Sequence, residues 1–175
     1  GLMECRVQIE VTWFIALGKL GLKNFPKLSS EACKFLSLII LNFSPEDAEA
    51  IKAIEKTTNH DVKAVEYWLK SKFEGVPELK AVSHFVHFAC TSEDINNVSH
   101  ALQLMTGRDT VVLPALDALI SKLRDMAHTH AAVPMLSRTH GQTASPTTVG
   151  KEIANVVARL DKARTHIARV ELMAK

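Results

Sequence analysis

Apolar side chains recur three and four residues apart along most of this chain. One such run extends from Leu2 to Leu20, and another covers 153–170 with lysine and arginine on the opposite face. This spacing gathers apolar residues on one side of a helix, whereas a strand needs alternation, which no segment sustains beyond a few residues. The 7 glycines and 6 prolines are also too few for a turn-rich β fold. The sequence therefore predicts an all-α protein.

Capping signals set the expected helix boundaries. Ser44 and Pro45 form a strong start signal for a helix that should end near Thr57, and Asp61 is expected to cap the helix that follows. Pro114 should kink or break the long segment in which it lies. Further helices are predicted over about 30–43, 77–90 and 91–130, and from about 146 to the end.

Composition disfavours several classes of function. The net charge of +2 does not indicate nucleic-acid binding, and the basic helix near the end of the chain carries no interleaved aromatic residues. The longest apolar run, 35–43, is about half as long as a membrane span, and the start of the chain does not resemble a signal peptide. Three cysteines without CxxC spacing suggest reduced thiols. We expect a cytoplasmic protein that binds neither nucleic acid nor membrane.

Three polar segments, 57–61, 91–97 and 137–145, separate the long predicted helices. Each has a purely structural interpretation when it is taken alone: a capping turn, a helix start, and a loop whose arginine pairs with an acid. Free backbone N–H groups and hydroxyls at a helix start, as at Thr91 and Ser92, also suit an anion. His60 and His140 can exchange a proton near neutral pH. Together the segments indicate a site that binds an anion and moves protons.

A metal site is a weaker hypothesis. The spacing of His84, His87 and Cys90 could place three zinc ligands on one helix face. No fourth ligand lies in an obvious cluster with them, so a partly buried helix face is the favoured interpretation. We expect no metal.

Three segments carry a resemblance to a known family. "KTTNHDVKAVEYWLK", "HFACTSEDINNVSHAL" and "LSRTHGQTASPTTVGKEIAN" together resemble the adenylosuccinate lyases of the bacterial type, over about 6–175. "TSED" and "RTHGQ" are similar to two signatures of the wider fumarase and aspartase superfamily, while "TTNHD" is particular to the adenylosuccinate branch. The resemblance implies a homotetramer of all-helical subunits. Residues 1–90 would form an N-terminal helical domain, and 91–175 the first part of a central helix bundle, truncated here.

The resemblance also implies a reaction and a set of roles. The family eliminates fumarate from adenylosuccinate to give AMP, and from SAICAR to give AICAR, without metal or organic cofactor. His140 would be the general acid that protonates the departing nitrogen, and His60 would support His140 or the substrate. His87 would contact the phosphate, and Thr91 and Ser92 the succinyl group. The implied substrate-binding residues are Asn59, His60, Asp61, His87, Thr91, Ser92, Thr139 and Gln142.

Two features of the family are missing from the sequence. One is an N-terminal "GRY"-like phosphate-binding stretch, and the other is a mobile "MPxKxNP"-like loop that supplies the serine base. The chain also starts at Gly1 and stops within "RVELMAK". We therefore expect a fragment of a longer enzyme that does not turn over alone. Two alternatives stay open: another lyase of the superfamily, acting on argininosuccinate or aspartate, and a helical interaction module without a site of its own.

Overall fold

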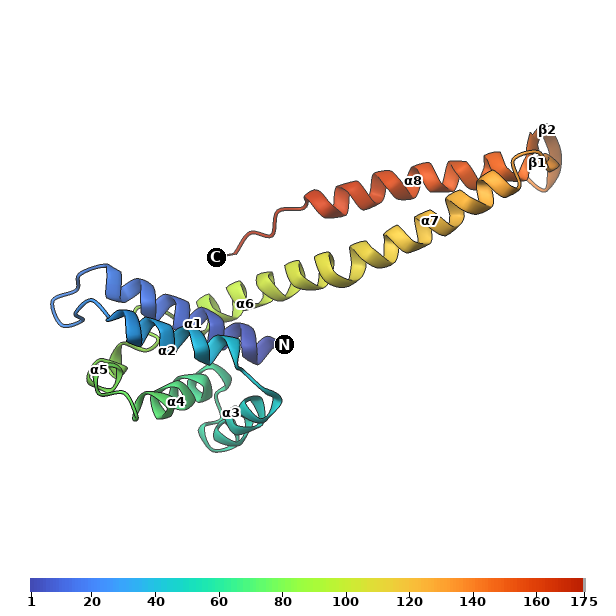
Figure 1. Cartoon of the computed structure of the whole chain (residues 1–175). Helices are drawn as coiled ribbons and strands as arrows, with labels where there is room; N and C mark the ends of the chain where they lie inside the picture. The colour runs from blue at the N-terminus through green and yellow to red at the C-terminus, as the bar shows by residue number, and fades with distance from the viewer. Residues whose placement is uncertain (175) are drawn as a thin grey trace. The chain divides into compact units, whose positions relative to one another are not determined.

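The computed structural model describes residues 1–174 and consists mainly of helices, as the sequence predicts (Figure 1). The chain divides into two compact units, which are described separately below. The first comprises Gly1–Gln103 together with the residues from Met173 onward, and the second is Leu104–Leu172. The boundary falls within one helix. The domain boundary expected at residue 90 in the intact protein stays a prediction.

The first unit is built around the apolar face of its first helix. Val7, Val11 and Phe14 are fully or almost fully buried at three-and-four spacing, so the predicted helix is confirmed. The buried face is not the predicted one: of the expected stripe that includes Ile9, Trp13 and Leu17, only Leu17 is buried. The Phe14 ring centroid lies 4.9 Å from that of Phe25 and 5.2 Å from that of Phe73. The helices of this unit are α1 (Leu2–Lys19), α2 (Ser30–Leu41), α3 (Pro45–Thr58), α4 (Asp61–Phe73), α5 (Pro77–Ala81) and most of α6 (Ser92–Gly107).

The junction of α3 and α4 confirms one predicted cap and corrects another. Ser44 and Asp47 form the expected reciprocal capping box at the start of α3. The residue that caps α4 is His60 rather than Asp61, because His60 is extended and its Nδ1 accepts the N–H of Lys63 at 3.1 Å. Asp61 is instead the first helical residue. Its carboxylate is thereby free to bond the N–H of Val62 and a residue of α1.

The helix predicted over 77–90 is wrong beyond its first turn. α5 ends at Ala81, a 3₁₀ turn covers Ser83–Phe85, and an irregular turn leads into α6. Val82, Phe85 and Val86 are all buried in the core, and the Phe85 ring stacks on Phe25 at 4.8 Å between centroids. Tertiary packing of these side chains therefore outweighs the helical propensity of the segment.

The second unit is a pair of long helices joined by a hairpin. A π-helical turn, Arg108–Val112, follows α6 and leads into α7 (Leu113–Thr129), which packs beside α8 (Val149–Arg169) (Figure 1). Pro114 lies in the first turn of α7, directly after the π turn. Pro114 has no N–H and crowds the carbonyl four residues before it, and the wider π turn accommodates both effects. The predicted kink or break is therefore a local widening of the helix.

The connection between α7 and α8 contradicts the expectation of helices only. Strands β1 (Pro134–Thr139) and β2 (Gln142–Thr148) form an antiparallel hairpin, with a register shift between Leu136 and Arg138. The last helix therefore starts at Val149 rather than near Pro146. Thr148 caps it through a bond from the Lys151 N–H at 3.2 Å. The two-residue turn His140–Gly141 allows the strands to pair.

The contact between α7 and α8 requires a glycine at position 150. A Cβ at Gly150 would lie 2.6 Å from Cα of Ala131 and would also overlap the carbonyl oxygen of Ala127, both of them backbone atoms. We expect Gly150→Ala to lower the free energy of unfolding by about 1–3 kcal/mol, because the backbone must move to admit the methyl group.

The matched control is Gly107→Ala. This glycine is helical, and a Cβ there meets no heavy atom within 4 Å. We expect this variant to gain about 0.5–1 kcal/mol, since alanine is the better helix former. Urea unfolding followed by circular dichroism measures both changes. Equal stability of the two variants would contradict the close packing at Gly150.

Candidate functional site

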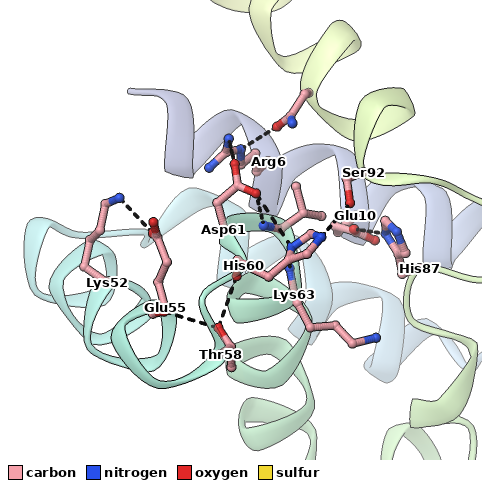
Figure 2. A network of polar contacts seen from close by, with 12 residues as sticks. Arg6, Glu10, Lys52, Glu55, Thr58, His60, Asp61, Lys63, His87 and Ser92 are labelled. Atoms are coloured by element: carbon pink, nitrogen blue, oxygen red, sulfur yellow. Dashed lines mark hydrogen bonds and ion pairs between the residues drawn. The ribbon is translucent and has the colours of Figure 1, made fainter.

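Two of the predicted polar segments meet in the first unit. His60, at the start of α4, lies with its Nε2 3.3 Å from the hydroxyl of Ser92 at the start of α6 (Figure 2). Because Nδ1 of His60 accepts the N–H of Lys63, the proton of the neutral ring resides on Nε2, and His60 donates to Ser92. The structure thus brings together two residues that stand 32 positions apart in the sequence.

The predicted residues Asn59, His60 and Asp61 line an open hollow of about 680 Å³ beside α3. Asn59 has a left-handed backbone, with φ at 52°, which ends α3 and turns the chain sharply into α4. Two lysines of α3, Lys52 and Lys56, also line the hollow, and Lys52 pairs with Glu55 at 2.7 Å. The hollow therefore combines amide, imidazole and ammonium donors with the carboxylates of Glu55 and Asp61, so it offers donors to an anionic group without an excess of positive charge from its lysines.

Asp61 is tied to α1 by an arginine that the sequence analysis missed. The Arg6 side chain is only 8% exposed, and its guanidinium binds both the Asp61 carboxylate and Oδ1 of Asn96, the latter at 2.8 Å (Figure 2). Burial raises the pKa of Asp61, but the N–H of Val62 and the charge of Arg6 outweigh it, so the pKa lies below its ordinary value. Asp61 is therefore an ionised anchor for the α3–α4 junction.

His87 is anchored to α1 in the same way. Its Nδ1 lies 2.6 Å from Oε1 of Glu10, a fully buried carboxylate that the sequence analysis also missed (Figure 2). The hydrogen bond that His87 donates to Glu10 raises the pKa of His87 above its ordinary value, although burial opposes the shift. The signal that could have revealed both α1 residues is their spacing: Arg6 and Glu10 are charged residues four apart within an apolar face.

Thr91 and Ser92 occupy the start of α6, as predicted. The N–H of Thr91 donates to Oδ2 of Asp94 at 2.8 Å, and Ser92 is the first helical residue. The interpretation of "TSED" as a helix start is thus correct. The same position leaves the Ser92 hydroxyl at the positive end of the α6 dipole, beside His60.

Thr139, His140 and Gln142 lie together in the second unit. Thr139 pairs with Gln142 across the hairpin, and His140 and Gly141 form the turn between them. Both turn residues have positive φ, 51° and 79°, which is the combination of a type I′ turn. Histidine is among the few non-glycine residues that tolerate this region, and the His140 side chain is exposed at the hairpin tip.

Asp61→Asn should weaken the tie between α1 and α4. We expect a loss of about 1 kcal/mol at neutral pH, allowing for the partial exposure of the carboxylate. Because the folded pKa is depressed, the carboxylate stabilises the wild type above about pH 5, and this difference shrinks as the pH falls below about 4. Unfolding midpoints measured across pH test this. Asp125→Asn, at an exposed acid of α7, is the control, and a pH-independent difference at position 61 would contradict the ionised pair.

Comparison with known proteins identifies the family. A family model described as lyase matches residues 2–174. The adenylosuccinate lyase of Escherichia coli (strain K12) is 52% identical over the whole chain, and that of Legionella pneumophila (strain Corby) is 47% identical over 97% of it. The chain spans 39% and 38% of these two proteins.

Solved structures agree at the level of the fold. A fumarate lyase from Mesorhizobium sp. BNC1 has a TM-score of 0.74 at 21% identity, and the match covers 95% of this chain and 36% of the chain of that enzyme. A 3-carboxy-cis,cis-muconate lactonizing enzyme from Pseudomonas putida has a TM-score of 0.71 at 24% identity, with the same shares covered. Residues 1–174 contain no helix that is long and apolar enough to cross a bilayer. Because the lyase family model matches nearly the full length of this chain, the chain belongs to the lyase family.

Proposed function

We propose that this chain is part of an adenylosuccinate lyase that eliminates fumarate from adenylosuccinate to give AMP, and from SAICAR to give AICAR. The observation that carries the proposal is the 52% identity to the Escherichia coli adenylosuccinate lyase over the whole chain. Because the chain covers 39% of that protein, the activity belongs to the full-length enzyme. We also propose that the enzyme is a cytoplasmic homotetramer, with purine nucleotides as its small-molecule substrates.

The elimination makes two demands on the protein. A base removes a proton from the carbon beside a succinyl carboxylate, and the electron pair forms the double bond of fumarate as the carbon–nitrogen bond breaks. The departing nitrogen then takes up a proton and becomes the amino group of AMP. Negative charge grows at the carboxylate during the first step, and fixed donors aimed at it stabilise the transition state more than the ground state.

We assign these tasks to residues in both units. His140 is the general acid for the departing nitrogen, and its exposed ring on a tight I′ turn supports the assignment. Thr91, Ser92, Thr139 and Gln142 supply hydroxyl and amide donors to the succinyl carboxylates. In this scheme the base is a serine on a segment outside this chain.

Residues at the α3–α4 junction complete the proposed site. His60 is polarised by the Lys63 N–H on one nitrogen and donates to Ser92 with the other, which supports its role as an aid to His140 or the substrate. Asn59 and Asp61 line the hollow beside it. To His87 we assign the nucleotide phosphate. These assignments require no metal or organic cofactor.

His140→Ala in the full-length enzyme tests the mechanism. We expect turnover to fall by two to four powers of ten, which is about the scale for the loss of an acid catalyst. The absorbance change as adenylosuccinate becomes AMP and fumarate measures it. His166→Ala, at an exposed histidine of α8, is the control and should keep its activity.

Two results would count against the proposal. A near-normal rate for His140→Ala would remove His140 from the mechanism. Wild-type fumarate release from argininosuccinate, with none from adenylosuccinate, would instead favour another lyase of the superfamily.

A further inference from the structure

The carboxylate of Glu10 is the most deeply buried charged group in the first unit. Its side chain has no solvent exposure, one oxygen contacts Nδ1 of His87 at 2.6 Å, and the other has no hydrogen-bond partner within residues 1–174. An ionised carboxylate in such surroundings is costly unless an opposite charge compensates it. The group in position to do so is the imidazolium of His87.

The other charged side chains near His87 also indicate that Glu10 is its main partner. Glu66 of α4, also buried, adds to the negative potential at the ring, and Lys63 of α4 opposes it. Glu66 is itself balanced by Lys63 at 3.0 Å and by Lys70 at 3.9 Å. Glu10 is therefore the acid whose charge His87 has to balance.

The backbone around His87 is held in a strained form by α1. His87 and Ala89 both have positive φ, 66° and 61°, a region that most non-glycine residues, alanine among them, avoid. Strain of this kind persists only where the surroundings hold it in place. Here Glu10 holds the ring, and Nε1 of Trp13, one turn later on α1, donates to the carbonyl of Phe88 at 2.8 Å. One face of α1 thus fixes both the turn and its side chain.

We propose that Glu10 is a positioning residue, which keeps His87 charged and directs its Nε2–H toward an anionic group of the nucleotide. This role rests on the proposed function, in which His87 contacts the phosphate. With Nδ1 committed to Glu10, Nε2 is the nitrogen available to the ligand. The buried carboxylate at 2.6 Å favours the protonated form of His87, because it raises the pKa of the ring above its ordinary value.

Glu10→Gln in the full-length enzyme tests the proposal. Glutamine keeps the size of the side chain and can still accept the Nδ1–H bond, but it lacks the charge. We expect KM for adenylosuccinate to rise about tenfold just above the ordinary imidazole pKa of about 6.5, with kcat nearly unchanged, because an uncharged ring holds the anion less well. As the pH falls further below that value the ring gains its proton in the variant too, so the ratio of variant to wild-type KM should fall toward one.

Two further variants separate this role from a structural one. Glu78→Gln removes a carboxylate that accepts bonds from Ser29 at 2.7 Å and 2.6 Å, away from His87, and its KM ratio should not depend on pH. In a His87→Gln background, adding Glu10→Gln should change KM no further, because Glu10 acts through His87. Additive effects of the two substitutions would contradict the proposal.

The outcome stays decisive if Glu10→Gln does not fold. Wild-type KM should then rise only above about pH 6.5, and His87→Gln should abolish that rise. Two results would overturn the role of Glu10 but not the proposed function. One is a folded Glu10→Gln enzyme with the wild-type KM at every pH, and the other is a wild-type KM that already rises at or below about pH 6.5. A wild-type enzyme inactive on adenylosuccinate would overturn the proposed function as well.

Discussion

The arrangement of the first unit depends on two charges buried on an apolar helix. Arg6 and Glu10 lie on the face of α1 that packs into the core, with exposed fractions of 6% and 0%. Neither charge is tolerable there without a partner, and the partners come from distant segments: Asp61 from the α3–α4 junction and His87 from the turn before α6. Electrostatic pairing therefore fixes the polar side chains of two segments whose neighbours, Val62 and Val86, are already held in the hydrophobic core.

The second unit positions its polar residues by a backbone constraint. A two-residue I′ turn fixes His140 at the tip of a hairpin, and the paired strands set Thr139 and Gln142 beside it. The hairpin is in turn carried by two long helices, which Gly150 allows to approach closely. In both units a rigid element carries a short polar segment, which is how loops acquire the precision that catalysis requires.

Sequence periodicity predicts the helix over 2–20 but not which of its faces is buried, because packing against distant segments decides that. It fails at 77–90, where buried Phe85 and Val86 override helical propensity, and at the hairpin, whose His140–Gly141 turn signal is hidden among polar residues. The motif residues of the candidate site could be chosen from the sequence by family resemblance. Arg6 and Glu10 could be noticed only as charged residues four apart within an apolar face, and their partners could not be predicted, because no local pattern records long-range pairing.

The central proposal is that, in the assembled full-length enzyme, His140 delivers a proton to the departing nitrogen of a bound nucleotide. A crystal structure of the full-length protein with AMP and fumarate bound tests this most directly. The account places the His140 ring within about 3.2 Å of the exocyclic purine nitrogen, or one water away, with fumarate against Ser92. A nucleotide bound elsewhere, or a His140 ring turned into dry apolar interior, would contradict it.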